Sequence, residues 1–307
     1  MKIYLNKASE NWIVDRFYSE WSSLNASITT NFIFNSDIIW LIAPWTWKKI
    51  NKKNLSRKKV VCTIHHIDES KFDESQKQEF YERDKYVDFY HVISEKTFNQ
   101  VYKLTNKKIF EIPFWVNQNI WFQLDNKSDL RKKYNIDEKS YLIGSFQRDT
   151  EGHDLKSPKL SKGPDQFLKI VKQLYDDKKE LSILLAGKRR QYLISELNKY
   201  KIPFHYLEMT NYQTLNELYN ILDLYIVASR VEGGPQSILE AAATKTPLIS
   251  TNVGIADKIL NKSSIFDMEN YMKAKPDVEY SYKNVKKYFV PEGLKSFYDM
   301  FEFISEN

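Results

Sequence analysis

The chain has 307 residues, which at roughly 100–200 residues per domain makes two domains the leading expectation. Hydrophobic residues make up 42% and aromatic residues 15% of the chain, so it can build real cores, and wholesale disorder is excluded. The 46 Lys and Arg residues against 40 Asp and Glu residues leave a net charge of +6, too small an excess for a dedicated nucleic-acid binder.

Features that would indicate export or membrane insertion are missing from the sequence. Cys62 is the single cysteine, which excludes a disulfide framework and a cysteine-based metal cage. No stretch approaches the ~18 consecutive apolar residues of a membrane span. The start of the chain, Met1–Lys7, lacks the apolar core and small-residue cleavage site of a secretory signal. These features predict a cytoplasmic protein.

Short apolar runs alternate with segments of helical spacing, which is the rhythm of repeated βαβ units around a parallel sheet. The expected strands of a first series are Lys2–Asn6, Asp37–Ala43, Lys59–Ile64, Phe89–Ile93 and Ile109–Phe114. The expected helices of that series are Glu10–Leu24, Glu74–Tyr86 and Glu95–Leu104. Residues 113–122 and the polar segment Asp125–Arg131 are then expected to connect this series to a second one.

The second series has the same rhythm. Its expected strands are Tyr141–Phe146, Leu181–Ala186, Phe204–Leu207, Leu224–Ala228 and Pro247–Thr251. Its expected helices are Asp165–Tyr175, Arg189–Lys199, Thr214–Ile221 and Gln236–Ala243. A last amphipathic helix is expected at Pro291–Ile304. We therefore predict an N-terminal domain (residues 1–115), a C-terminal domain (116–290) and a terminal helix (291–307) that packs back across the domains.

The segment from Ser229 to Ala243 is the most informative for function. It predicts a buried strand, a glycine turn, Pro235 in a first helical turn, and a helix. A helix that begins at the carboxyl edge of a parallel sheet offers backbone amides and the positive end of its dipole to phosphate groups. The amides concerned belong to Gly233, Gly234, Gln236 and Ser237.

Two glutamates in this segment need a different explanation, because carboxylates repel phosphate. Glu240 lies about one turn into the helix, where it could accept both protons of a vicinal diol such as a ribose. Glu232 precedes the turn and projects toward whatever lies beyond the phosphates. The alternative without a functional role is that Glu232 is a solvated loop carboxylate and that Glu240 is an ordinary glutamate in the first turn of a helix. The surrounding pattern favours a site for a nucleotide sugar.

These residues carry a resemblance to a known family. Glu232, seven intervening residues and Glu240, with Gly233-Gly234-Pro235 after the first, are similar to the signature of family 4 retaining glycosyltransferases of the GT-B fold. Further motifs occur in the family's order. They are Ile112-Pro113 with Val116-Asn117, Ile143–Arg148, Lys162–Asp165 and Pro247–Gly254. The resemblance covers about Ile109 to Leu260.

The resemblance implies an α/β fold with two Rossmann-like domains facing across a cleft, the N-terminal one reduced. It implies transfer of a hexosyl group, with retention, from a nucleotide sugar to a hydroxyl of a glycan, lipid-linked or small-molecule acceptor. Neither a cofactor nor a metal is expected, and no Asp-x-Asp occurs in the chain. The alternative hypothesis is a noncatalytic nucleotide-sugar-binding or scaffolding subunit of a glycosylation complex.

The resemblance also implies roles for individual residues. Arg148 and Lys162 would neutralise the donor diphosphate, where the plain alternatives are a strand-end surface charge and a turn lysine. Glu232 would lie near the donor sugar and Glu240 on the ribose, with the amides of Gly233 and Gly234 against phosphates or sugar hydroxyls. The insertion between the two cations, residues 149–161, is longer than the family pattern predicts.

Histidines and a basic stretch complete the candidates. His65 follows a buried strand, and this arrangement resembles the family's motif of a strand followed by a histidine. Two roles for His65 remain open: it donates or accepts a hydrogen bond with the transferred sugar, or it helps to deprotonate the acceptor. His66 is a weaker candidate, and His91 is interpreted as structural.

Residues 48–59 hold seven cations and no acid. This stretch predicts either a solvated charge run or a peripheral contact with the inner face of an anionic membrane. Lys245 stands where the family has a glycine, at a position that often needs positive φ.

Overall fold

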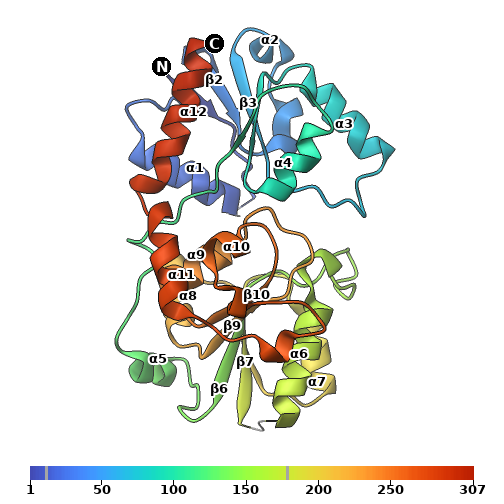
Figure 1. Cartoon of the computed structure of the whole chain (residues 1–307), viewed down its shortest axis with the longest axis vertical. Helices are drawn as coiled ribbons and strands as arrows, with labels where there is room; N and C mark the ends of the chain where they lie inside the picture. The colour runs from blue at the N-terminus through green and yellow to red at the C-terminus, as the bar shows by residue number, and fades with distance from the viewer. Residues whose placement is uncertain (11–12, 178–179) are drawn as a thin grey trace. The chain divides into compact units, whose positions relative to one another are not determined.

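The computed structural model describes residues 1–10, 13–177 and 180–307, and the chain folds into two compact units. Unit 1 comprises Met1–Pro113 together with Leu294–Asn307, and unit 2 comprises Phe114–Gly293. Each unit is built around a parallel sheet covered by helices (Figure 1). The α/β architecture expected from the sequence is therefore present in both units.

Among the residues described, unit 1 contains a five-stranded parallel sheet in the order β1-β2-β3-β4-β5. The strands are β1 (Ile3–Leu5), β2 (Ile38–Leu41), β3 (Lys59–Ile64), β4 (Phe89–Val92) and β5 (Ile109–Glu111). All residues of β2 are buried, as in a sheet with helices on both faces. The β-branched and apolar run Val60–Ile64 explains the central position of β3.

The helices of unit 1 begin at side-chain caps where the sequence supplies them. Asp73 accepts a hydrogen bond from the amide of Gln76, and Ser94 one from the amide of Thr97. The helices are α1 (Ile13–Leu24), α2 (Lys52–Leu55), α3 (Glu74–Asp84), α4 (Glu95–Tyr102) and α12 (Lys295–Glu306). In α12, Phe297 and Phe301 are fully buried, and Phe301 packs on the rings of Trp21 and Trp40 at centroid distances of 5.3 and 5.2 Å.

The described part of unit 2 holds a six-stranded parallel sheet in the order β8-β7-β6-β9-β10-β11. The strands are β6 (Tyr141–Ser145), β7 (Leu181–Ala186), β8 (Phe204–Leu207), β9 (Leu224–Val227), β10 (Leu248–Thr251) and β11 (Ile265–Phe266). The strands β7 and β8 follow on one side of β6, and the chain then crosses to the other side of β6, where β9, β10 and β11 follow. This is the doubly wound order of dinucleotide-binding folds, in which ligands bind beyond the carboxyl ends of the strands at the switch point, here between β6 and β9.

The helices of unit 2 connect these strands (Figure 1). They are α5 (Lys127–Lys133), α6 (Pro164–Asp177), α7 (Gln191–Lys199), α8 (Tyr212–Asn220), α9 (Gln236–Ala243), α10 (Ala256–Ile259) and α11 (Val278–Val285). Lys245, which stands where the family has a glycine, adopts the left-handed conformation with φ +55°. Within the described residues, no helix is long and apolar enough to cross a membrane.

The predicted strands are confirmed, with ends that differ by at most a few residues, and α9 matches the prediction residue for residue. The helix predicted at Glu10–Leu24 begins at Ile13, and residues 11 and 12 of that prediction lie outside the described residues. The sequence pattern missed α2, α10, α11 and β11, which are short elements of two to eight residues.

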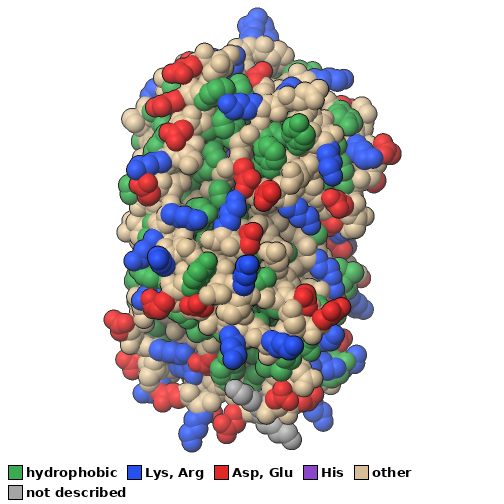
Figure 2. Space-filling view, viewed as in Figure 1, with side chains coloured by type: hydrophobic (Ala, Val, Ile, Leu, Met, Phe, Trp, Pro, Cys, Tyr) green, Lys and Arg blue, Asp and Glu red, His purple; other side chains and the backbone are tan. Residues whose placement is uncertain are grey.

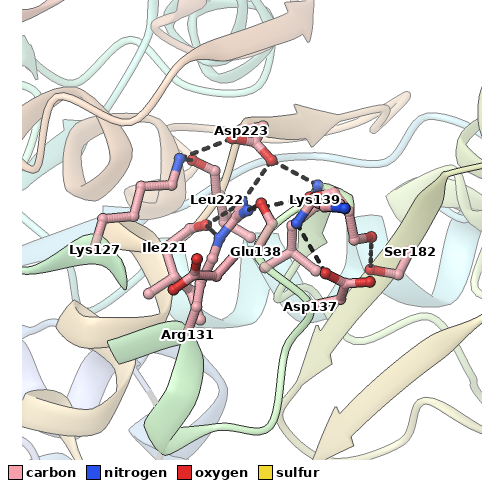
Figure 3. A network of polar contacts seen from close by, with 11 residues as sticks. Lys127, Arg131, Asp137, Glu138, Lys139, Ser182, Ile221, Leu222 and Asp223 are labelled. Atoms are coloured by element: carbon pink, nitrogen blue, oxygen red, sulfur yellow. Dashed lines mark hydrogen bonds and ion pairs between the residues drawn. The ribbon is translucent and has the colours of Figure 1, made fainter. Parts of the chain in front are cut away.

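The division between the two units falls between Pro113 and Phe114, inside the segment predicted as the connection, and the rest of that segment belongs to unit 2. Residues 127–131 of the polar segment belong to α5, and the aromatic residues Trp115 and Trp121 are fully buried. The helix is fixed by a tertiary contact that sequence patterns do not contain (Figure 3). Arg131 donates through Nη2 to Asp223 Oδ2 at 2.5 Å, and Asp223 Oδ2 also accepts from the amide of Leu142 at 2.8 Å. This network lies at the amino ends of β6 and β9.

Surface charge agrees with the modest net charge of the sequence. On the face shown in Figure 2, Lys and Arg side chains are interspersed with Asp and Glu side chains. Several cations of residues 48–59 have partners. Lys48 pairs with Glu79 and lies 3.7 Å from Glu82, and Lys58 donates to the carbonyl of Phe34 at 3.1 Å. Part of the positive charge of this stretch is therefore neutralised by acidic residues of its own unit.

Candidate functional site

A pocket lies at the carboxyl edge of the unit 2 sheet. Its polar lining consists of Ser145, Gln147, Arg148, Asp149 and Lys162. Residues 145 and 147–149 end or follow β6, and Lys162 precedes α6. The two cations expected to act on a diphosphate, separated by a long insertion in the sequence, therefore line one pocket.

A glycine turn places Lys162. Gly163 adopts the left-handed conformation with φ +62°, and a Cβ added there would lie 1.7 Å from the carbonyl oxygen of Ala228. The turn is thus packed directly against the residue that follows β9. Only glycine permits this approach without a backbone shift, and the approach brings Lys162 to the carboxyl end of β9.

Lys162 and Glu232 form a close ion pair. Lys162 Nζ lies 2.6 Å from each carboxylate oxygen of Glu232. The side chains are 21% and 8% exposed, so solvent screens the pair only partly. Ser229 Oγ lies 3.0 Å from Glu232 Oε1 and holds the carboxylate from its other side. The positive charge of Lys162 is therefore already partly neutralised by Glu232 before any anion binds in this pocket.

Arg148 is held differently from Lys162. Its Nε donates to the carbonyl of Thr150 at 2.9 Å, and the residue lines the pocket. Partial burial and then the nearby charge of Arg189 lower the pKa of Arg148 below its ordinary value. A partly desolvated cation beside a second cation gains from an anionic ligand, because the ligand relieves the repulsion.

Gln147 and Ser229 connect the pocket to the start of α9. Ser229 Oγ lies 2.8 Å from Gln147 Oε1, and Gln147 Nε2 lies 3.5 Å from Ser237 Oγ. Both residues lie within the sequence motifs, but no role was predicted for either. Their position directly after β6 and β9 was the signal that could have identified them.

Glu240 is buried in α9 and is held by a tyrosine. The hydroxyl of Tyr219 donates to Glu240 Oε2 at 2.9 Å, and the two residues are 1% and 5% exposed. Burial, and secondarily the charge of Glu240, raise the pKa of Tyr219 well above its ordinary value. Tyr225 OH accepts a hydrogen bond from the amide of Phe146 at 3.2 Å, and burial raises its pKa to about 12. Tyr225 stands in the apolar run Leu224–Ala228, which conceals its polar role.

The start of α9 differs slightly from the prediction. Pro235 is the N-cap, with φ −64° and ψ 113°, so it precedes the helix and does not lie in its first turn. Gln236 and Ser237 are the first helical residues. Gly254 has φ +59°, and a Cβ there would lie 2.6 Å from the carbonyl oxygen of Gly233. The loop after β10 therefore rests directly on the Gly233-Gly234-Pro235 turn.

His65 belongs to unit 1, where it follows β3. Its Nε2 lies 2.8 Å from the carbonyl oxygen of Ile42, which assigns the proton to that nitrogen. Desolvation by burial lowers the pKa of His65 to about 4, so the imidazole is neutral at neutral pH. His91 is fully buried, with its ring nitrogens on Thr63 Oγ1 and the carbonyl of Ile112. Its structural interpretation is confirmed.

The described residues also bear on metal binding. Across residues 1–10, 13–177 and 180–307, no group of three or more His, Cys, Asp and Glu side chains is arranged to hold a metal ion. Metal independence stays a prediction. The structure brings Arg148 and Lys162 to one pocket and pairs Lys162 with Glu232, whereas Glu240 is held separately by Tyr219.

Solved structures share this architecture. HepE from Anabaena in complex with UDP has 12% identity and a TM-score of 0.73, with 100% of each chain covered. Sucrose-phosphate synthase from Thermosynechococcus elongatus has 14% identity and a TM-score of 0.69, with 96% of this chain and 79% of that chain covered. The pneumococcal O-GlcNAc transferase GtfA in complex with UDP and GlcNAc has 16% identity and a TM-score of 0.65, with 88% and 57% covered. These likenesses show the GT-B fold.

Sequence comparison identifies the family. Among curated protein sequences there is no significant match. The family model for glycosyl transferases group 1 matches residues 126–284, which is more than half of the chain. The matched region lies within unit 2 and contains Arg148, Lys162, Glu232 and Glu240. This chain belongs to the group 1 glycosyl transferases.

Proposed function

We propose that this protein is a metal-independent, retaining glycosyltransferase of the family 4 type. It transfers a hexosyl group from a nucleotide sugar to a hydroxyl of a glycan, lipid-linked or small-molecule acceptor. Two observations carry the proposal: Arg148 and Lys162 line one pocket at the carboxyl edge of β6 and β9, and Lys162 forms a close ion pair with Glu232. Retention is proposed because the segment from Glu232 to Glu240 resembles the signature of family 4 retaining glycosyltransferases.

The leaving group explains the two cations. A nucleoside diphosphate departs with negative charge, and positioned cations stabilise that charge in the transition state. Arg148 and Lys162 supply the two positive charges from opposite ends of the insertion. In this proposal the diphosphate takes over part of the Lys162 charge from Glu232, and the released carboxylate accepts hydrogen bonds from the donor sugar.

The nucleoside end uses Glu240 and the start of α9. The carboxylate of Glu240 accepts hydrogen bonds from the ribose hydroxyls, and Tyr219 fixes its orientation. The backbone of Gly233 and Gly234, together with Gln236 and Ser237 at the start of α9, faces the phosphates or the sugar hydroxyls.

The chemistry of His65 narrows its role. A histidine with a pKa of about 4 is a weak base at neutral pH, so it is poorly suited to take the acceptor's proton. We therefore propose that His65 acts as a neutral hydrogen-bonding group toward the transferred sugar.

A thermal-shift panel of UDP, GDP and ADP sugars tests the donor site. A ligand present at about 100 times its Kd adds roughly 2.7 kcal/mol of stability. UDP is the first choice because the solved complexes of HepE and GtfA contain it. We expect one nucleotide class to raise the melting temperature and Glu240→Ala to reduce this response. No response to any nucleotide at saturating concentration would refute the donor-site assignment.

Product analysis then separates an enzyme from a noncatalytic binding subunit. The stabilising donor is incubated with acceptor mixtures, and the anomeric configuration of the product is read by NMR. Transfer with the donor's configuration supports retention, whereas an inverted product would contradict the family 4 assignment. Tight donor binding without hydrolysis or transfer to any acceptor would favour the binding subunit.

We also propose a cytoplasmic location with peripheral contact to anionic membrane. Phe32 and Phe34 are 60% and 69% exposed, and Lys58 binds the carbonyl of Phe34, so aromatic rings lie beside the basic segment. The exposed cations of that segment are Lys48, Lys49, Lys52, Lys53, Arg57 and Lys59. Sedimentation with phosphatidylglycerol vesicles, but not with phosphatidylcholine vesicles, would support this contact, and equal sedimentation of a Lys52→Glu/Lys53→Glu variant would refute it.

A further inference from the structure

Arg190 is a fully buried arginine that precedes α7 at the carboxyl edge of the unit 2 sheet. Its guanidinium spans the ends of two strands: Nη1 donates to the carbonyls of Ser145 and Ala186, and Nη2 donates to Ser145 Oγ at 3.1 Å. Its Nε donates to Asp149 Oδ2 at 2.6 Å. A buried charge persists only with such partners, so this pair fixes the geometry around it.

Asp149, the partner of Arg190, is joined to both cations of the candidate site. It is the chain neighbour of Arg148 and lines the same pocket. Its carbonyl accepts a hydrogen bond from the amide of Lys159 at 2.8 Å. The carbonyl of Lys159 in turn accepts from the amide of Lys162 at 2.8 Å. A continuous path of hydrogen bonds therefore runs from Arg190 to the backbone of Lys162.

The insertion of residues 149–161 is closed by the same arrangement. The amides of Asp149 and Thr150 both donate to the carbonyl of Arg189 at 3.1 Å, and Thr150 pairs with Pro158 in an antiparallel bridge. The amide of Glu151 donates to the carbonyl of Ser157 at 2.9 Å. The long insertion thus returns the chain to its starting point, which is why Arg148 and Lys162 reach one pocket.

A second buried arginine allows this role to be separated from plain stabilisation. Arg131 is 5% exposed and pairs with Asp223 at 2.5 Å, but at the amino ends of β6 and β9 (Figure 3). It also donates to the carbonyl of Ile221. The two arginines therefore share chemistry, burial and sheet, and differ in the edge of the sheet that they hold.

We propose that Arg190 is a positioning residue for donor binding, which acts through Asp149 to hold Arg148 and Lys162 at the diphosphate. This inference rests on the proposed function. Arg190 has no contact with the donor in this arrangement. Its effect on the reaction is exerted through the backbone on either side of the insertion.

The experiment compares two paired substitutions. Arg190→Met with Asp149→Asn removes both charges of the pair at once, so no buried charge is left unpaired. Arg131→Met with Asp223→Asn is the matched control at the opposite edge. Calorimetry measures the dissociation constants of a nucleoside diphosphate and of its free nucleoside, with the base that binds wild-type protein. The diphosphate reports on the two cations, and the nucleoside does not.

We expect the Arg190 variant to bind the diphosphate about tenfold or more weakly, because charge-assisted hydrogen bonds to phosphate depend strongly on geometry. Its affinity for the nucleoside stays within about twofold of wild type, as do both affinities of the Arg131 control. Unchanged diphosphate affinity in the Arg190 variant would overturn the inference. An equal loss for diphosphate and nucleoside would overturn it too, because that is the signature of a general structural role.

A thermodynamic cycle tests the route of the effect. In an Arg148→Ala/Lys162→Ala background the Arg190 substitution should weaken diphosphate binding by less than about twofold, since the groups through which it acts are gone. Full additivity of the losses would contradict the route. If the protein with Arg190→Met and Asp149→Asn does not fold, Arg190→Lys is measured in its place. Wild-type diphosphate affinity in the Arg190→Lys variant would overturn the inference. Wild-type protein that binds no nucleoside diphosphate would instead refute the proposed function.

Discussion

At the scale of single residues, Glu232 has two opposing effects on the neighbouring lysine. Its carboxylate lies 2.6 Å from Lys162 Nζ and fixes the lysine in the pocket. The same negative charge repels a diphosphate. Because the pair is mostly shielded from solvent, neither effect is cancelled by screening. Binding and turnover should therefore respond to Glu232 in opposite directions.

We predict that Glu232→Gln tightens nucleoside diphosphate binding about three- to tenfold, because it removes a repelling charge and frees Lys162. We also predict that the variant lowers the transfer rate about tenfold or more, because the carboxylate next to the donor sugar is lost. Calorimetry and a transfer assay measure the two effects. Glu217→Gln is the control, since Glu217 pairs with Lys133 on other elements of unit 2. Weaker diphosphate binding by Glu232→Gln would contradict this account.

His65 predicts a pH dependence of stability. Its pKa is about 4 in the folded protein and about 6.5 in an unfolded chain, so the unfolded chain binds the proton more tightly. The stabilisation from the neutral imidazole is complete above about pH 6.5 and is lost as the pH falls toward 4. His91, with a pKa of about 3, acts in the same direction.

We predict that unfolding free energy decreases between pH 6.5 and pH 4.5 and that His65→Gln makes this decrease smaller by up to about 2 kcal/mol. Glutamine keeps an N–H for the carbonyl of Ile42 and does not titrate. Denaturant titrations of both proteins at several pH values measure the difference. Parallel loss of stability in the two proteins would show that His65 does not titrate as the structure indicates.

At the scale of elements, the turns around the site are set by glycines that cannot be replaced freely. Gly163 ends the turn that carries Lys162, and an added Cβ would meet the Ala228 carbonyl. Gly152 has φ +78°, but an added Cβ there would meet the exposed side chain of Asp154 at 3.0 Å. The two glycines thus share a left-handed backbone and differ in the space around it.

We predict that Gly163→Ala destabilises the protein by about 2 kcal/mol or more and weakens nucleoside diphosphate binding, because the backbone must move and Lys162 moves with it. Gly152→Ala should cost about 1 kcal/mol and leave binding unchanged. Chemical denaturation and calorimetry provide the two measurements. Equal effects of both substitutions on binding would contradict the role given to the Gly163 turn.

The elements also show what the sequence could predict. The helix α9 was predicted to the residue because an apolar period follows a glycine-proline turn, and β3 because its apolar run is uninterrupted. The helix α5 was missed because Arg131 stabilises it through a distant aspartate. In the candidate site, the motif residues were recognised, but their contacts were not. The link from Arg190 to Asp149 joins two charged residues that look like surface residues in the sequence.

At the scale of the whole molecule, unit 1 is formed by two separate segments of the chain, Met1–Pro113 and Leu294–Asn307. The matched family region lies within unit 2, while residues 294–307 complete unit 1. The helix α12 covers Trp21 and Trp40, two of the largest buried side chains. The stability of unit 1 therefore depends on the last residues of the chain.

We predict that Phe301→Ala lowers the unfolding free energy of unit 1 by about 3–5 kcal/mol, the cost of removing a buried phenylalanine. The fluorescence of Trp21 and Trp40, which its ring contacts, reports the transition during urea titration. Phe303→Ala on the same helix is the control, because Phe303 is only partly buried and should cost less. Similar stabilities of the two variants would contradict the assignment of α12 to the core of unit 1.

The most direct test of the donor site is a crystal structure of the protein with the nucleoside diphosphate that stabilises it. We expect the two phosphates within hydrogen-bonding distance of Arg148 and Lys162, and the ribose hydroxyls within hydrogen-bonding distance of Glu240. A diphosphate bound elsewhere, with these three side chains in contact only with protein, would contradict the account.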